Sequence, residues 1–395
     1  MLSEQAAPVV RATLPAVGGA LGEITERFYG RLFAAHPELL RDLFNRGNQA
    51  NGDQRKALAG SIAAFAVALL ENPDGRPDAL LSRIAHKHAS LGITSEQYKI
   101  VHEHLFAAIA EVLGDAVTPE VAQAWDEVYW LMANALISVE ARLYQEAGVA
   151  EGQVWRTMEI AERREETADT VSFVLRHVDG TPTAPFRPGQ YVSVQVTLPD
   201  GARQIRQYSL SAAPGRPQWR ITVKRVAGDP AGEVSSWLHA HAAAGDTVEV
   251  SAPFGDLVLP EGESPLLLAS AGVGGTPMLA MLDHLAATGS DRPVVVVHAD
   301  RAPASHAHAD ELRRLVDALP QGTLHLWYEE PGESGARPGR ADVTLLDLPA
   351  GTTAYLCGPL PFLRAVRGDL LGRGVAAADI HYEVFGPDLW LGTEG

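Results

Sequence analysis

The spacing of apolar residues changes twice along this chain, and each change marks a different class of fold. Up to about residue 148 the apolar residues recur at helical spacing. From about residue 152 they alternate with polar residues, as in Val192, Val194 and Val196. From about residue 262 continuous apolar runs such as Val294–Val297 alternate with helical patterns, which is typical of a parallel sheet. The sequence therefore predicts an all-α domain over residues 1–148, an antiparallel β-barrel over 152–261 and an α/β parallel-sheet domain over 262–395.

The first segment contains two strong helix starts. Thr94 and Gln97 form the pattern of a capping box, and Thr118 is followed by Pro119 at the first helical position. We expect the two helices that begin there to form a hairpin. A Gly- and Asn-rich break is expected at Gly47–Gly52. Shorter helical patterns cover three further ranges, Gly22–Ala35, Gln54–Leu70 and Leu80–His88.

Charge and composition exclude several classes of protein. The 32 basic and 49 acidic residues give a net charge of −17, which argues against binding to nucleic acid or to an anionic membrane. The longest apolar stretch, Ile62–Leu70, is too short to span a bilayer, and the N-terminus lacks the pattern of a secretory signal, so we expect a cytoplasmic protein. Because Cys357 is the only cysteine, an intrachain disulfide and an iron–sulfur cluster are excluded, and redox chemistry requires another cofactor.

Histidines are the candidate metal ligands. His88 is in phase with Leu81 and Ile84 and is predicted to face inward, whereas His86 is predicted to be exposed. Helical phase alone leaves His88 open as a ligand or as an ordinary core residue. Three closely spaced pairs could suggest zinc. Two of them lie in segments predicted to be helical, where a spacing of two points the side chains apart, and the third is expected in a loop; the pairs are His102/His104, His239/His241 and His306/His308.

Four short motifs resemble the globin domain of the flavohaemoglobins: Phe28-Tyr29, Leu43–Leu58, Ala85–His88 and Glu96–Tyr98. The resemblance implies that His88 is the proximal ligand of a haem b iron. It also places Phe44 against the haem, and Tyr29, Gln54 and Leu58 on the distal side. Tyr98 and Glu140 would contact the iron-bound histidine, since a carboxylate behind an imidazole raises its basicity. Without the family pattern, Tyr29 is better explained as a core tyrosine with its hydroxyl at the surface. A core Tyr98 and a solvated Glu140 are the alternative on the proximal side.

The middle segment contains Pro188–Val192 and Arg206–Leu210, which resemble the FAD-binding barrel of the ferredoxin-reductase superfamily. The resemblance implies that Arg206 binds the FAD diphosphate and that Tyr208 and Ser209 lie beside the isoalloxazine ring. Gln207 lies in the same element, and Tyr191 is expected to contact or cover the flavin. A second phosphate element, a Gly-x-Val-Ser turn that opens a helix at Ser235–His241, comprises Gly232, Val234 and Ser235.

The last segment contains Ser270–Met278 and Tyr355–Pro359, each at the end of an apolar run. Together they resemble the NAD(P) domain of the same superfamily, in which a glycine turn lets the backbone approach a pyrophosphate. The expected nucleotide-site residues are Gly272, Gly274, Gly275, Thr276 as the N-cap, Pro277, Cys357, Gly358 and Pro359. The first motif alone could be only a tight turn, and Cys357 only a small buried residue.

The tail His381–Pro387 resembles the closing strand of the family. The resemblance places Phe385 over the flavin and puts Glu383 and Lys87 toward the boundary between haem and flavin. Val384 and Gly275 depart from the cysteine and glutamine that are common there, which puts the detail of the nicotinamide site in doubt. Residues 388–395 receive no interpretation.

Taken together, the resemblance implies a nitric oxide dioxygenase that detoxifies nitric oxide. NAD(P)H would reduce FAD, FAD would reduce the haem iron, and oxygen on ferrous haem would convert nitric oxide to nitrate. A gas sensor and a broad NAD(P)H-dependent flavin or haem reductase are the alternatives. The choice between NADH and NADPH stays open because Asp300 and Arg301 have opposite effects on a 2′-phosphate. Haem occupancy is also open. A monomer is expected, with a lipid ligand in the haem pocket as an open question.

Overall fold

The computed structural model describes residues 2–71 and 78–386. Internal contacts divide the chain into two compact units. One contains the residues up to Trp155 together with Thr197–Ile205, and the other contains Arg156–Val196 and Arg206–Phe385. Among the described residues, no helix is long and apolar enough to cross a membrane.

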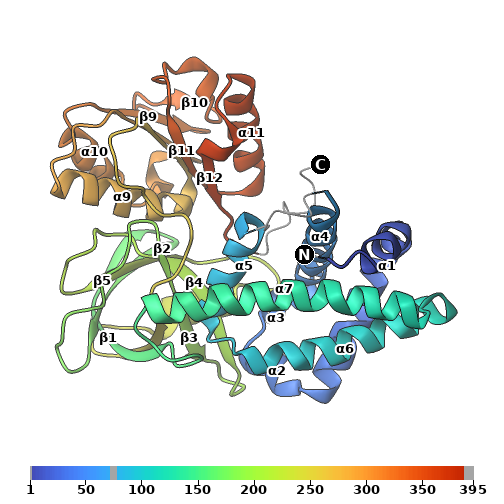
Figure 1. Ribbon diagram of the computed structural model, residues 1–395. Helices are drawn as coiled ribbons and strands as arrows, with labels where there is room; N and C mark the ends of the chain where they lie inside the picture. Colours follow the sequence, from blue (N-terminus) through green and yellow to red (C-terminus); the bar gives the residue numbers. More distant parts are fainter. Residues whose placement is uncertain (1, 72–77, 387–395) are drawn as a thin grey trace. The chain divides into compact units, whose positions relative to one another are not determined.

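The first 150 residues form a helical domain (Figure 1). Its helices are α1 (Ala6–Ala35), α2 (Pro37–Asp42), α3 (Arg46–Ala50), α4 (Asp53–Glu71), α5 (Asp78–Leu91), α6 (Ser95–Leu113), the 3-10 turn η1 (Gly114–Ala116) and α7 (Pro119–Glu146). Helix α1 begins well before the predicted start at Gly22. The expected break at Gly47–Gly52 was wrong in part, because it contains α3, where the Asn45 side chain accepts hydrogen bonds from the amides of Gly47 and Asn48.

Both predicted helix starts are confirmed. The amide of Thr94 donates to the Gln97 side chain at 2.8 Å, and the Thr118 side chain accepts from the amide of Val121 at the start of α7. Helices α6 and α7 run side by side (Figure 1), and His102 of α6 contacts Asp126 of α7 at 2.6 Å. Both helices also pack against α1, and α7 packs against α5, so the apolar faces that the spacing predicts are buried inside one bundle.

The second part of the chain is a six-stranded antiparallel sheet in the order β4-β3-β6-β1-β2-β5. Its elements are β1 (Trp155–Thr167), β2 (Thr170–His177), β3 (Tyr191–Thr197), β4 (Arg203–Ser209), β5 (Trp219–Lys224), α8 (Glu233–His241) and β6 (Thr247–Ser251). A bridge between Leu210, directly after β4, and Ile221 of β5 joins the two edge strands. The predicted barrel is therefore closed by pairing of its first and last strands.

The third part is a six-stranded parallel sheet in the order β10-β9-β8-β7-β11-β12. Its strands are β7 (Leu266–Ala271), β8 (Val294–Asp300), β9 (Gly322–Tyr328), β10 (Arg337–Pro338), β11 (Thr353–Cys357) and β12 (Ile380–Glu383). Its helices are α9 (Gly275–Ala287), α10 (Ala309–Asp317) and α11 (Leu360–Gly372), with 3-10 turns η2 (Gly272–Gly274), η3 (Pro303–Ser305), η4 (Val343–Leu345) and η5 (Ala377–Asp379). This is the parallel α/β arrangement that the apolar runs predict.

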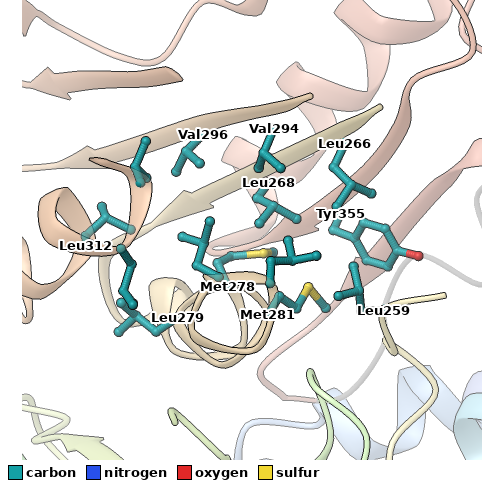
Figure 2. Close-up of a cluster of buried hydrophobic side chains, with 14 of the residues drawn as sticks. Leu259, Leu266, Leu268, Met278, Leu279, Met281, Val294, Val296, Leu312 and Tyr355 are labelled. Atoms are coloured by element: carbon teal, nitrogen blue, oxygen red, sulfur yellow. The ribbon is translucent and has the colours of Figure 1, made fainter. Parts of the chain in front are cut away.

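The core of the third part lies between the sheet and α9. Figure 2 shows Met278 and Met281 of α9 beneath Leu268 of β7 and Val296 of β8. Successive strands are added outward in both directions from β7, so the strand order reverses between β7 and β11. In open parallel sheets, ligands bind at the carboxyl ends of the two strands that flank such a reversal. The two predicted nucleotide motifs follow these two strands.

Candidate functional site

Three side chains from three helices meet in the helical domain. His88 lies near the end of α5, Tyr98 in the first turns of α6, and Glu140 in the second half of α7. Nδ1 of His88 is 2.9 Å from Oε1 of Glu140 and 2.9 Å from the Tyr98 hydroxyl oxygen, and the hydroxyl donates to the same carboxylate oxygen at 2.6 Å. An ionised carboxylate only accepts, so this arrangement fixes the proton of the imidazole on Nδ1.

The remaining nitrogen of His88, Nε2, suits an iron ion. The Nδ1 atom is engaged by Glu140 and Tyr98, and Nε2 makes no hydrogen bond to any residue that the structure describes. One third of the side chain is exposed, while the Glu140 side chain behind it is buried. A proximal haem histidine needs this donor set, in which a partner holds Nδ1 and leaves the other nitrogen neutral and accessible.

The hydroxyl of Tyr98 stays protonated. Burial raises its pKa, and the nearby negative charge of Glu140 raises that pKa further. A neutral hydroxyl can continue to donate to Glu140 at every physiological pH. Tyr98 therefore helps to hold the carboxylate in place without adding charge of its own.

Tyr29 of α1 is a further buried tyrosine of the helical domain. It is 6% exposed, and burial raises the pKa of its hydroxyl even though hydrogen bonding from Gln54 and Gln49 acts in the other direction. Its ring packs against Phe44 and Phe33, with centroid distances of 5.9 and 5.6 Å. Tyr29 thus presents a neutral hydroxyl among packed aromatic rings, with the predicted residue Gln54 beside it.

Gln49 is a residue that the sequence analysis missed. It lies in the short helix α3, inside the segment predicted to be a break, so no helical period linked it to Tyr29. Leu58, one turn after Gln54 on α4, is half-buried. The exposure predicted for His86 was wrong, because that residue is half-buried and takes part in an interaction of its own.

The two predicted phosphate elements of the flavin site lie together. The guanidinium of Arg206 on β4 is 3.7 Å from the carboxylate of Glu233, the first residue of α8. Gly232 precedes that helix, and a Cβ atom there would lie 2.7 Å from the Ser235 hydroxyl oxygen and 2.8 Å from Val226. A side chain at this position would clash, so the backbone conformation at the helix start requires glycine. The free amides of the helix start and the guanidinium nearby suit an anionic diphosphate. The helix begins at Glu233 and not at Ser235 as predicted.

The other flavin candidates have distinct environments. Tyr208 is a half-buried residue whose pKa is raised by burial, while Ser209 is buried. The amide of Gln207 donates to the Ser193 hydroxyl on β3 at 3.0 Å. Tyr191 is buried with its ring against Gly255, where an added Cβ would lie 3.0 Å from the ring. Val234, by contrast, is wholly buried in the first turn of α8, which is a packing position.

The two nucleotide motifs touch through their backbones at the strand reversal. A Cβ atom on Gly274 would lie 2.3 Å from the carbonyl oxygen of Cys357 and 2.8 Å from the amide nitrogen of Gly358. Gly272 has φ +54°, a left-handed conformation that favours glycine. Strands β7 and β11 are paired directly, with Ser270 opposite Cys357. Glycine at position 274 therefore allows the two turns to approach each other closely, and any side chain there would block the contact.

Helix α9 begins differently from the prediction. It starts at Gly275 with Gly274 as its N-cap, and the Thr276 hydroxyl donates to the carbonyl of Val273 at 2.9 Å, so the N-cap assignment to Thr276 was wrong. Pro277 does lie in the first turn. Pro359 forms the N-cap of α11. Cys357 is fully buried, and burial raises the pKa of its thiol.

The end of the chain differs in one respect from the predicted strand. Strand β12 stops at Glu383, opposite Cys357 on β11, and Phe385 lies beyond it as an exposed aromatic, 48% exposed. Glu383 and Lys87 are both half-buried. Pro387 and the stretch 388–395 lie outside the described residues, and the structure gives no physical account of Val384.

A buried histidine cluster at the carboxyl ends of β7, β8 and β9 escaped the sequence analysis. The rings of His298 and His306 stack at 3.9 Å, Nδ1 of His298 is 2.9 Å from the Ser270 hydroxyl, and Nδ1 of His306 is 2.7 Å from that of Tyr328. His308, which caps α10 with φ +62°, is 3.0 Å from the Thr222 hydroxyl on β5. The loop predicted for His306/His308 is confirmed, because both residues lie between η3 and α10, and both side chains are buried.

Comparison with known proteins agrees with this architecture. Three family models match consecutive parts of the chain: Globin over residues 26–136, Oxidoreductase FAD-binding domain over 157–258 and Oxidoreductase NAD-binding domain over 268–368. These matches lie inside the three predicted domains, whose end points stay predictions.

Several known proteins match this chain over nearly its whole length. The Flavohemoprotein of Chromobacterium violaceum is 43% identical over 98% of both chains, and that of Rhizobium meliloti is 42% identical over 99% of this chain and 100% of the relative. The crystal structure of a flavohemoglobin from Malassezia yamatoensis, solved with bound FAD and heme, matches 98% of this chain and 100% of its own with a TM-score of 0.90 and 39% identity. An FAD/NAD-binding domain of nitric oxide dioxygenase from Vibrio cholerae matches 60% of this chain and 100% of its own, with a TM-score of 0.57 and 40% identity. The chain therefore belongs to the flavohemoprotein family, with a globin domain followed by FAD-binding and NAD-binding oxidoreductase domains.

Proposed function

We propose that this chain is an NAD(P)H-dependent nitric oxide dioxygenase, which converts nitric oxide and oxygen to nitrate. The observation that carries the proposal is the contact of His88 with Glu140 and Tyr98 in a chain that also contains a complete pair of reductase domains. The name of the matching Vibrio cholerae structure supports the same activity. Nitric oxide, oxygen and NAD(P)H are the small-molecule partners in this proposal.

The residues present suit a haem b, and we assign His88 as its iron ligand through Nε2. When bound, the haem would supply the redox-active iron at which a gas is activated. Glu140 and Tyr98 hold the imidazole proton on Nδ1 and keep negative charge behind it, which makes Nε2 a stronger electron donor. This favours oxygen chemistry over simple oxygen storage.

On the distal side, Tyr29 is the donor for a ligand atom that gains negative charge. Its hydroxyl is buried and protonated, and the neighbouring Gln54 and Gln49 add amide donors. Phe44 and Leu58 supply the apolar walls that exclude water. A donor fixed in such a pocket stabilises charge more than it would in water.

The second half of the chain would supply electrons. When bound, FAD would supply the chemistry that converts a two-electron donor, NAD(P)H, into single-electron steps, which is why the reaction requires a flavin. We assign Arg206 and the start of α8 to its diphosphate, and the turn Gly272–Gly275 with Cys357–Pro359 to the nicotinamide nucleotide. The proposal also includes the roles that the family resemblance implies for Lys87, Glu383 and Phe385.

The rival with the closest chemistry is a reductase of broad acceptor range. It would oxidise NADH with any artificial acceptor and would have no need of the hydrogen-bonded Tyr29 and His88. A gas sensor would need neither turnover nor nitrate. Cytoplasmic location, a monomeric state and a lipid ligand in the haem pocket remain predictions.

The test uses the purified full-length chain loaded with haem and FAD. Its absorbance spectrum should show a Soret band, and NADH oxidation should accelerate only when nitric oxide and oxygen are both present. Equal rates with and without nitric oxide would overturn the proposal. If the chain takes up no haem, so that the Soret band is missing, but still oxidises NADH with artificial acceptors, the broad reductase is favoured.

A further inference from the structure

The residues that follow strand β4 are hydrogen-bonded to two helices of the NAD-binding domain. Strand β4 ends at Ser209, and residues 210–216, which we call the joint segment, continue directly from it. The joint segment and both helices lie inside one compact unit of the chain, which includes Arg206–Phe385. These contacts therefore attach the proposed flavin site to the domain that carries the nucleotide turn.

Asp283 of α9 makes the first attachment. Its carboxylate accepts from the amide of Ala213 at 2.7 Å and from the guanidinium of Arg216 at 2.5 and 2.7 Å. Both of these partners belong to the joint segment. The Asp283 side chain is only 9% exposed, and a buried carboxylate is costly unless it is paired and hydrogen-bonded. Because α9 begins at Gly275, this contact connects the joint segment to the helix that starts at the nucleotide turn.

Arg220 of β5 makes the second attachment, to Glu311 of α10. Its Nε donates to the Ser211 hydroxyl at 3.1 Å, and its guanidinium also donates to the Ser211 carbonyl. The same guanidinium donates to both carboxylate oxygens of Glu311, at 2.9 and 3.1 Å. A two-point contact of this kind fixes orientation as well as distance. Since Ser211 belongs to the joint segment, Arg220 holds the joint segment against α10.

Glu311 is a largely buried carboxylate that stays ionised. Its side chain is 20% exposed, and that of Arg220 is 12% exposed. Burial raises the pKa of Glu311, but hydrogen bonds from His308 and Arg220 act in the other direction and lower that pKa to about 2. The ion pair is therefore complete at every physiological pH, and salt screens it less than it screens a surface pair.

His308 closes the second attachment into a ring of hydrogen bonds. Its Nδ1 is 3.2 Å from the Glu311 carboxylate, and its Nε2 is 3.0 Å from the Thr222 hydroxyl. The Thr222 hydroxyl is in turn 3.1 Å from that of Ser211. The left-handed backbone of His308 is uncommon for a residue with a side chain and persists only where the surroundings hold it. The ring therefore opposes movement of Ser211 relative to α10.

The joint segment lies next to the proposed site of hydride transfer. Tyr208 and Ser209, which the family resemblance places beside the flavin ring, immediately precede it on β4. Strand β5, which carries Arg220, packs against the turn η2 of the nucleotide site. Hydride transfer needs reacting atoms about 3–3.5 Å apart, and a displacement of about 1 Å can slow such a step about a hundredfold. Small shifts of the joint segment should therefore change the rate of transfer.

We propose that Asp283 and Glu311 are positioning residues of the hydride-transfer step. They hold the joint segment against α9 and α10 and so set the distance between the nicotinamide and the flavin. In that step NADH loses a hydride, which carries two electrons, and becomes NAD⁺ as FAD accepts the hydride. Both carboxylates are engaged by protein groups, so they act through the joint segment. The inference rests on the proposed function only for NAD(P)H as the electron donor.

The test measures flavin reduction by NADH in the absence of nitric oxide and oxygen. Full-length protein loaded with haem and FAD is mixed with NADH in an anaerobic stopped-flow instrument, and the flavin absorbance is followed at increasing NADH concentrations. Asp283→Asn and Glu311→Gln preserve the size of each side chain and remove its charge. Asp310→Asn makes the same change at a fully exposed position of α10 and is the matched control.

The limiting rate at saturating NADH should fall about tenfold or more in the two variants and stay unchanged in the control. The NADH concentration for half-maximal rate and the affinity for FAD should stay within about twofold. A merely structural defect would instead lower the FAD content or the stability and leave the limiting rate of the loaded protein unchanged. If Asp283→Asn fails to fold, Arg216→Ala removes the same ion pair from its exposed side, and Arg216→Lys should recover part of the rate.

Amide hydrogen exchange provides a readout that needs no turnover. Peptides that cover the joint segment should exchange faster in Asp283→Asn and Glu311→Gln than in wild type, and at the wild-type rate in Asp310→Asn. The inference is overturned if the limiting rates of both variants match that of the control, or if these rates fall while exchange in the joint segment is unchanged. Rapid flavin reduction without nitrate formation would instead count against the proposed function alone.

Discussion

Glu140 accepts a hydrogen bond from Nδ1 of His88 at 2.9 Å, although the two residues are 52 positions apart in the chain. The carboxylate is buried on α7 and also accepts from Tyr98. A buried charge is costly unless it is paired and hydrogen-bonded, so this geometry ties the imidazole to one orientation and one tautomer.

The substitution Glu140→Gln tests this contact. It preserves the size of the side chain but removes the negative charge, so His88 becomes a weaker electron donor. We expect a more positive haem reduction potential and a fall of about tenfold in turnover. Potentiometric titration of the Soret band measures the first effect. Glu146→Gln, exposed on the same helix, is the control, and an unchanged potential in Glu140→Gln would contradict the proximal role.

The substitution Tyr29→Phe removes the distal hydroxyl and leaves the aromatic packing against Phe44 in place. Loss of a hydrogen bond to a charged group corresponds to a change on the order of tenfold or more. We therefore expect oxygen to dissociate from the reduced protein faster by that factor, measured by stopped-flow absorbance. Tyr144→Phe makes the same chemical change at a hydroxyl that donates to the carbonyl of Ile93. Equal dissociation rates in the two variants would show that Tyr29 makes no contact with the ligand.

Flavin binding should depend on Arg206. Replacement by alanine removes a guanidinium close to the start of α8, and a charge-assisted contact with a phosphate is worth roughly 2 kcal/mol. The dissociation constant of FAD should rise about thirtyfold, measured by the recovery of flavin fluorescence on dilution. Arg203→Ala, on the same strand, should leave it within about twofold. Equal affinities in the two variants would remove Arg206 from the phosphate site.

Gly274 should tolerate no side chain. An alanine Cβ would lie 2.3 Å from the carbonyl oxygen of Cys357, so the turn or strand β11 must shift, at a cost of about 1–3 kcal/mol. The KM for NADH should increase and the thermal midpoint should fall. Gly368→Ala, in α11 with no atom near its Cβ, should be neutral or slightly stabilising. If the two variants behave alike, the close contact does not constrain the nucleotide turn.

The buried His306 should make stability depend on pH. Burial, with help from the charge of His298, lowers its pKa from 6.5 to about 2. Between these values the unfolded chain binds a proton that the folded chain does not, so stability is complete above about pH 6.5 and falls as the pH decreases. The slope from this residue approaches about 1.4 kcal/mol per pH unit. Thermal unfolding of His306→Asn between pH 5 and 7 should show a shallower dependence than wild type. An identical slope in His306→Asn, or an equal reduction in the exposed control His241→Asn, would contradict this account.

Much of the architecture could be predicted because the spacing of apolar residues indicates which face of each helix or strand is buried. The helix starts at Thr94 and Thr118, the change to strands near residue 155 and the parallel strands from Leu266 onward all follow from local patterns. Local patterns did not predict where several helices begin. The start of α1, the short helix α3 and the first residue of α9 depend on tertiary packing that overrides local propensity.

The residues of the candidate site could likewise be predicted only in part. His88, Tyr98 and Glu140 could be nominated from helical phase and family motifs, and hydrogen bonds join them. Gln49 and the stacked pair of His298 and His306 could not be predicted, because no hydrophobic period connects residues that meet only when separate elements of the chain fold together. The contact of Gly274 with Cys357 is likewise a property of paired strands that are distant in sequence.

The central claim is that this chain adds both atoms of one oxygen molecule to nitric oxide. The most direct measurement supplies the haem- and FAD-loaded protein with NADH, nitric oxide and ¹⁸O₂, and analyses the product by mass spectrometry. One electron is needed for each nitrate and NADH supplies a pair, so the account predicts nitrate with two ¹⁸O atoms and about two nitrate ions for each NADH oxidised. Unlabelled nitrate, nitrite as the main product, or NADH oxidation without nitrate would contradict it.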